Sequence, residues 1–154
     1  MRLHIANKIK ENEYLVHSDM FNVSKFPVKC NVINTGLSEL NALNISTGLA
    51  LNNNIVYLYG VCGFIIHKYE QLRFGIRDIG SKKGKIIIFN AGKIGYESIG
   101  PGHILNDDLD IMKILKIPYF IPKDLKDLDK ILQKIEKEKT GVFYIQLGKD
   151  YNRY

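Results

Sequence analysis

The chain has 154 residues, of which 45% are hydrophobic and 25% charged, and this length fits one domain with a full hydrophobic core. No apolar run is long enough to span a bilayer, and residues 1–14 lack the apolar centre of a signal peptide. These features argue against a membrane-spanning or secreted protein, so we expect a single cytoplasmic domain over residues 1–154.

The net charge of +6 raises the question of an anionic partner such as nucleic acid. The lysines alternate with acids along residues 123–139, as on a solvated helix surface, and the sequence offers no aromatic–basic platform for stacking bases. The cysteines, Cys30 and Cys62, are too few and too hydrophobically flanked for a disulfide scaffold or a metal site. Small-molecule chemistry is therefore favoured over nucleic-acid binding, and both thiols are expected to be reduced.

The spacing of apolar residues predicts short strands that alternate with helices. In chain order the predicted elements are helix 1–13, strands 14–18 and 30–34, helix 38–53, strand 55–60, helix 63–80, strand 84–90, a glycine-rich loop 91–103, helix 107–115, strand 117–121, helix 123–139 and strand 141–147. Strands that are apolar throughout and separated by helices indicate a mainly parallel sheet covered on both faces. The predicted fold class is therefore a doubly wound α/β domain.

Ligands of such sheets bind beyond the carboxyl ends of the strands. Three segments follow predicted strands directly: the NTGLSE turn, the YGVCGF turn and the loop 91–103. We therefore expect any chemistry to involve these three segments.

The segment TGLSELNALNISTGLAL resembles the Gly-Ile-(Ala/Ser)-Glu-Gln segment, and the helix after it, in the pyrimidine-binding domain of transketolases and related thiamine diphosphate enzymes. FIIHKYEQLRFGIRD is similar to the aromatic helix of that family, and SIGPGHILNDDLDIM to its Gly-Pro-Thr-His loop. FIPKD and GVFYIQLGK are similar to its Pro-Ala-Asp segment and its closing strand. The resemblance covers about residues 17–149 in the family order.

The resemblance implies a catalytic role for Glu39 in thiamine diphosphate chemistry. In the family, the matching carboxyl group forms a hydrogen bond with N1′ of the aminopyrimidine and so helps to remove the C2 proton of the thiazolium ring. A carboxyl group sheltered from water suits that hydrogen bond. The alternative, from the residues alone, is a helix-terminal glutamate favoured by the helix dipole.

The resemblance also implies a wider site. Phe64 and Tyr69 match aromatic residues that contact the aminopyrimidine, although core packing on one helix face would also explain them. Asp19 and Gly36 match positions near the cofactor. Glu39, Phe64, Tyr69, Asp19 and Gly36 are thus the predicted cofactor-binding residues.

Three histidines are the predicted substrate-binding residues. His103 lies in the Gly-Pro-x-His loop, where the family histidine faces the substrate channel and helps to stabilise charge on oxygen, so it is also a catalytic candidate. The alternative for His103 is an ordinary surface residue. His67 matches a basic channel position of related synthases, and His17 follows the first strand, where the family places cofactor-proximal residues.

The sequence departs from the family pattern at three places. Leu40 replaces the family glutamine after the glutamate, Ile99 replaces an aspartate that reads a donor hydroxyl, and Gly102 replaces the threonine of the loop. These changes put the identity of the donor sugar in doubt, but not that of the cofactor.

The sequence contains no Asp-Gly dipeptide and so lacks the Gly-Asp-Gly motif that holds Mg²⁺ and the diphosphate in this family. No metal site is predicted on this chain. The resemblance instead implies a split enzyme, in which a separate subunit binds the diphosphate of thiamine diphosphate through Mg²⁺ in an α₂β₂ complex.

Three functions remain open from the sequence. The favoured one is a subunit of a transketolase-like enzyme that transfers a two-carbon ketol unit from a ketose to an aldehyde acceptor, on sugar, sugar-phosphate or sugar-nucleotide substrates. The second is another reaction of the same cofactor: a 1-deoxyxylulose-type synthase, a decarboxylase or an oxo-acid dehydrogenase β subunit. The third is a non-catalytic scaffold that keeps the fold.

Overall fold

Residues 1–19, 28–91 and 107–147 are described here, from a computed structural model of the chain. Within these residues, six parallel strands form one sheet in the order β2-β1-β3-β4-β6-β5. The strands are β1 (Tyr14–His17), β2 (Asn31–Asn34), β3 (Ile55–Val61), β4 (Lys85–Ala91), β5 (Tyr119–Phe120) and β6 (Gly141–Leu147). The predicted doubly wound α/β class is confirmed.

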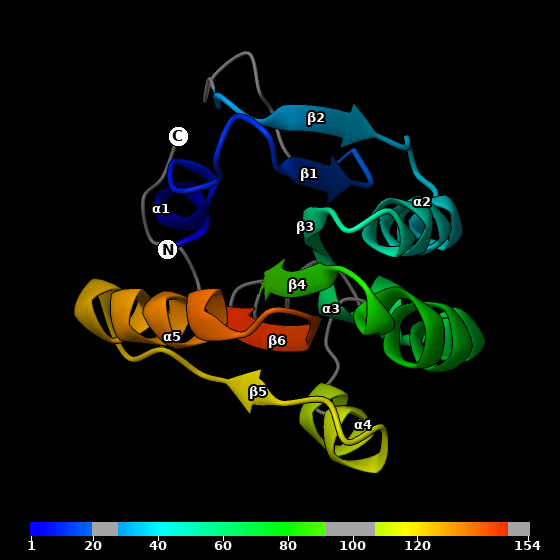
Figure 1. Cartoon of the computed structure of the whole chain (residues 1–154). Coiled ribbons are helices and arrows are strands. Elements are labelled where there is room, and N and C mark those ends of the chain that lie inside the picture. The colour runs from blue at the N-terminus through cyan, green and yellow to red at the C-terminus, as the bar shows by residue number, and fades with distance from the viewer. Residues whose placement is uncertain (20–27, 92–106, 148–154) are drawn as a thin grey trace.

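Helices cover both faces of the sheet (Figure 1). They are α1 (Arg2–Ala6), α2 (Glu39–Leu51), α3 (Cys62–Ile66), the π-helix η1 (Gln71–Ile79), the short 3₁₀ helix η2 (Gly80–Lys82), α4 (Asp108–Ile114) and α5 (Leu125–Lys137). In Figure 1, α1 and α5 lie on one side of the sheet, and α2 and α4 lie on the other.

Two hydrophobic cores form because successive side chains of a strand point to opposite faces. Val56 and Leu58 of β3 join the core beneath α2, η1 and α4. Tyr57 and Tyr59 of the same strand join the core beneath α1 and α5. The central strands are therefore buried on both faces, which explains why their sequences are apolar throughout. The edge strand β2 is only half-buried.

The strand order places a topological switch between β1 and β3. From β1 the chain moves outward to β2, and it then returns through α2 to β3 on the other side of β1. In register, His17 at the end of β1 lies between Asn34 of β2 and Tyr59 of β3. A crevice at the carboxyl ends of such strands is the usual ligand site of a doubly wound sheet.

The structure corrects three predicted boundaries. The helix expected over 1–13 ends at Ala6, and its second half forms turns in which the backbone N–H of Lys10 donates to Glu13 Oε2 at 2.9 Å. The helix expected over 63–80 divides into α3 and η1, and the strand expected over 117–121 contains only Tyr119 and Phe120. No helix among the described residues is both long enough and apolar enough to cross a bilayer.

Candidate active site

The ends of β1 and β2 are held together by the side chain of Asn34. Its amide oxygen accepts the backbone N–H of Asp19 at 3.0 Å and that of Gly36 at 2.9 Å, and its Nδ2 donates to Asp19 Oδ1 at 3.1 Å. Both Asp19 and Gly36 have positive φ angles, +53° and +65°. Gly36 adopts this conformation without the strain that a side chain would add. The two predicted residues, after β1 and after β2, are therefore joined through one side chain, and sequence reasoning missed this asparagine.

Thr35 connects this turn to the start of α2. Its backbone N–H donates to the carbonyl oxygen of His17 at 2.9 Å, and its hydroxyl donates to the carbonyl oxygen of Ser38 at 3.0 Å. Ser38 precedes the helix, and its own carbonyl oxygen accepts the N–H of Ala42. These contacts fix where α2 begins relative to the end of β1.

Glu39 is the first residue of α2 and is half-buried at the carboxyl edge of the sheet. A carboxylate in a first turn is stabilised by the positive end of the helix dipole. Its neighbours Leu37 and Leu40 are 85% and 39% exposed. Apolar side chains are therefore exposed on both sides of this half-buried acid.

His17 is 1% exposed at the end of β1, directly beside the switch point. It shares a sheet face with Leu15, which belongs to the core beneath α1 and α5. Burial lowers the pKa of His17, and the charge of nearby Asp19 opposes that shift only in part. The imidazole of His17, two residues before Asp19, is therefore buried and neutral at neutral pH.

The segment that follows β3 carries three more of the predicted residues. Phe64 is half-buried on α3, and His67 is exposed at the end of that helix. Tyr69, two residues further on, is 38% exposed. Glu39 follows β2 and Phe64 follows β3. Because these strands are parallel, the two residues lie at the same edge of the sheet. Tyr69 and His67 lie further out on the surface.

A buried polar cluster at the ends of β4 and β6 was not predicted. The hydroxyl of Tyr144 donates to Asp108 Oδ2 at 2.6 Å, and the same oxygen accepts the side-chain amide of Gln146 at 2.6 Å. Asn90 Nδ2 donates to the Tyr144 hydroxyl at 3.1 Å. Burial raises the pKa of the adjacent Cys62 thiol to about 12, so this cysteine is a protonated thiol at neutral pH. The cluster fixes the start of α4 on the sheet.

The signal for this cluster was present in the sequence as Asn90 and Gln146, two amides near the carboxyl ends of otherwise apolar strands. Their partner Asp108 is 38 residues from Gln146, so spacing alone could not pair them.

Comparisons with known proteins give matches at the level of structure. No family profile and no curated protein matches the sequence. The structure superposes on a split gene transketolase, described as an inactive β4 tetramer, with a TM-score of 0.72 and 22% identity over 95% of this chain. It also superposes on transketolase from Campylobacter jejuni, with a TM-score of 0.71 and 16% identity over 94% of this chain.

The chain has the fold of a transketolase domain. A third structure, of a thiamin diphosphate-dependent enzyme isolated from Mycobacterium smegmatis, matches with a TM-score of 0.65 and 9% identity over 94% of this chain. The chain spans 48%, 24% and 30% of the three matched chains in turn. It therefore corresponds to one part of each of them.

The transketolase-type fold brings four predicted residues to one edge of the sheet: Asp19, Gly36, Glu39 and Phe64. His103 and the substituted positions Ile99 and Gly102 lie outside the described residues.

The residues at this edge suit the aminopyrimidine end of thiamine diphosphate, which supplies an acidic C2 carbon when it is bound. Glu39 is the half-buried acid that could form the hydrogen bond to its ring, and Phe64 is the half-buried aromatic residue that could contact the ring face. Among the described ranges, no group of three His, Cys, Asp or Glu residues could hold a metal ion.

Proposed function

We propose that this chain is the pyrimidine-binding subunit of a split thiamine diphosphate-dependent enzyme of the transketolase type. The observation that carries the proposal is the position of Glu39. It is a half-buried acid at the carboxyl edge of a sheet whose fold is shared with transketolases, beside the switch point where such sheets bind ligands.

Each residue of this edge has a distinct role in the proposal. Glu39 forms the hydrogen bond to N1′ of the aminopyrimidine, and Phe64 contacts its ring. Asp19 and Gly36 shape the turn that faces the cofactor, through their hydrogen bonds with Asn34. A carboxyl group in this position assists proton removal, an effect worth about 10²–10⁴ in rate.

The proposed reaction is the transfer of a two-carbon ketol unit from a ketose to an aldehyde acceptor. In this proposal His103 stabilises charge on the substrate oxygen, and the exposed His67 lies along the substrate path, whereas His17, which is 1% exposed, is too buried to contact substrate. The match to a structure named only as a thiamin diphosphate-dependent enzyme supports a second candidate, another reaction of the same cofactor, in which the role of Glu39 is unchanged.

A partner subunit completes the proposed site. It holds the diphosphate through Mg²⁺, since this chain's described residues offer no metal cluster, and it covers Leu37, which is 85% exposed next to Glu39. One of the matched structures is a split gene transketolase whose β4 tetramer is described as inactive. We likewise expect this chain to be inactive alone and active in an α₂β₂ complex.

Co-purification tests the proposal. This chain would be co-expressed with a neighbouring gene product that carries Gly-Asp-Gly and the downstream asparagine, and thiamine diphosphate binding would be measured by calorimetry with Mg²⁺. We expect the complex to bind the cofactor and the isolated chain not to bind it. Tight binding by the isolated chain, or a complex that forms without binding the cofactor, would contradict the proposed division of the site.

A further inference from the structure

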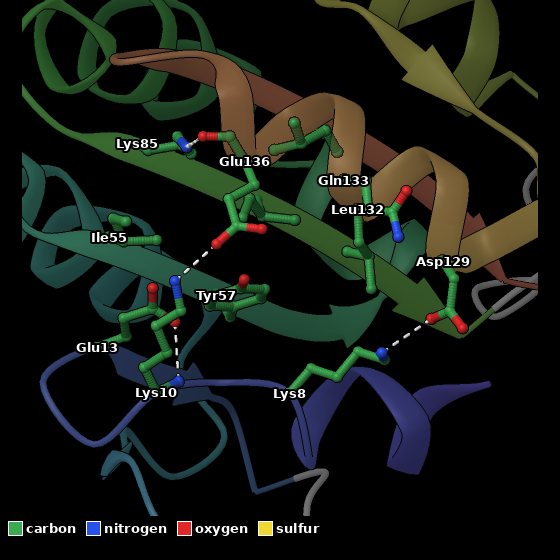
Figure 2. Close-up of a pocket in the computed structure, with 12 residues that line it drawn as sticks. Lys8, Lys10, Glu13, Ile55, Tyr57, Lys85, Asp129, Leu132, Gln133 and Glu136 are labelled. Carbon is green, nitrogen blue, oxygen red and sulfur yellow. Dashed lines mark hydrogen bonds and ion pairs between the residues drawn. The ribbon is translucent and has the colours of Figure 1, made fainter.

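A cavity of about 490 Å³ lies at the opposite, amino edge of the sheet (Figure 2). Its walls come from residues 8–13, the first residues of β3 and β4, and one face of α5. This volume falls within the range of small-molecule sites, about 300–1,000 Å³. The residues of the proposed active site are not among its lining residues, so the two sites are distinct.

Charged pairs cross the mouth of the cavity. Lys8 Nζ lies 3.1 Å from Asp129 Oδ1, and Lys10 Nζ lies 2.7 Å from Glu136 Oε1. Figure 2 shows both pairs joining residues 8–10 to α5. These four side chains are largely solvated and neutralise one another, so they contribute little net charge to the interior.

The other two charged residues that line the cavity, Lys85 and Glu13, are buried. Lys85 is 3% exposed and Glu13 is 4% exposed. In the part of the chain described here, Lys85 donates one hydrogen bond, to the carbonyl oxygen of Glu136 at 3.2 Å, and forms no ion pair. Glu13 accepts the backbone N–H of Lys10. An ammonium has three donors and a carboxylate about four acceptor sites, so both retain unused capacity.

The sheet register explains why these two charges do not meet. Lys85 pairs with Ile55 across β3 and β4, and Tyr14, which follows Glu13, pairs with Val56. Glu13 lies one residue before β1, so Glu13, Ile55 and Lys85 follow one another across the amino ends of β1, β3 and β4. Two strand spacings separate the charged residues, about 10 Å between their backbones. Figure 2 shows Ile55 between Lys85 and Glu13.

The space between them has an apolar base. Ile55, Ile87, Leu132 and Ile135 line it, together with the ring of Tyr57. Burial lowers the pKa of Lys85 and raises that of Tyr57, as expected for polar groups that have lost water. Buried charges of this kind are normally satisfied by a partner of opposite charge.

We propose that this cavity binds a small amphoteric metabolite, an α-amino acid with an aliphatic side chain. Its carboxylate pairs with Lys85, its ammonium pairs with Glu13, and its side chain contacts Ile55, Ile87 and Leu132. A simple anion fits less well, because the cavity is lined by three acids as well as three lysines. A simple cation fits less well for the same reason.

Three matched probes test the class of ligand by calorimetry: L-leucine, 4-methylpentanoate and 3-methylbutylamine. The second lacks the amine and the third lacks the carboxylate, while the aliphatic part is similar in all three. We expect L-leucine to bind at least about tenfold more tightly than either analogue, because each analogue leaves one buried charge unpaired. Equal binding of an analogue, or no binding of L-leucine at millimolar concentration, would overturn the proposal.

Two variants and one spectrum locate the site. Lys85→Met and Glu13→Gln should each weaken L-leucine binding at least about tenfold, whereas Lys113→Met, on α4, should not change it. Lys85→Met removes a buried charge and keeps the side-chain length, so the chain should still fold. In wild-type protein, methyl NMR should show shifts at Ile55 and Ile87 on addition of L-leucine. Unchanged binding in both variants would place the ligand elsewhere and refute the assignment.

Discussion

At the scale of single residues, the position of Glu39 is compatible both with a structural role and with the catalytic role proposed for it. As the first residue of α2 it is stabilised by the helix dipole, and it is half-buried at the carboxyl edge of the sheet. The two readings of this glutamate are therefore compatible. Asp108 and Tyr144, in contrast, form a hydrogen bond although they are 36 residues apart, so they could not be paired from the sequence.

Tyr144 is expected to matter for stability through its hydroxyl. Tyr144→Phe removes the donor to Asp108 and the acceptor for Asn90, and it leaves a buried carboxylate with one fewer hydrogen bond. We expect the free energy of unfolding to fall by about 1–3 kcal/mol in urea titrations. Tyr119→Phe, on the half-buried edge strand β5, is the matched control and should change it by far less. Equal effects would show that the cluster does not stabilise the fold.

The lowered pKa of His17 predicts that the free energy of unfolding falls with falling pH. Its pKa in the folded chain lies below the usual 6.5, so the unfolded chain binds the proton more readily and acid favours unfolding. Neutral His17 therefore makes its full contribution to the free energy of unfolding above pH 6.5. That contribution is lost as the pH falls from 6.5 towards the lower pKa of the folded chain.

His17→Gln should therefore reduce the loss of unfolding free energy between neutral and mildly acidic pH. His67→Gln, at an exposed position, should leave that loss as in the wild type. Denaturant unfolding at several pH values measures both. A wild-type slope in the His17 variant would refute the assignment.

At the scale of elements, the sequence predicted the order of strands and helices well, because the apolar periodicity of buried strands and amphipathic helices is strong. Boundaries were less predictable. The helix expected over 63–80 became α3 followed by η1, and a π-helix has no separate periodicity signal in so short a segment. The helix expected over 1–13 ended early because Glu13 bonds to Lys10 in a turn. The sheet order also could not be read from the sequence.

Two glycines test how closely the elements pack. A Cβ at Gly84 would lie 2.4 Å from the backbone oxygens of Ala50 and Asn54, so Gly84→Ala must displace backbone. We expect it to lower the free energy of unfolding by at least about 2 kcal/mol.

Gly48, inside α2, has no atom within 4 Å of such a Cβ. Gly48→Ala should raise the free energy of unfolding by about 0.5–1 kcal/mol. Urea titration of both distinguishes close packing from a general effect of glycine replacement.

At the scale of the whole molecule, the proposed function requires a second chain. In that proposal, Glu39 and Phe64 contact the aminopyrimidine, and the partner subunit holds the metal-bound diphosphate. The same proposal has the partner cover Leu37, which is 85% exposed beside Glu39. The identity of the partner cannot be predicted from this chain, because the partner's contact surface is encoded in the partner's own sequence.

The most direct test of the central claim is the rate at which the C2 proton of thiamine diphosphate exchanges with deuterium in the reconstituted complex, followed by quenched-flow NMR. This rate needs no knowledge of the substrate. We predict that Glu39→Gln slows it by about 10²–10⁴ while the complex still forms and binds the cofactor. Asp110→Asn, which alters an exposed first-turn acid of α4, should leave it unchanged. A Glu39→Gln complex that exchanges this proton at the wild-type rate would contradict the account.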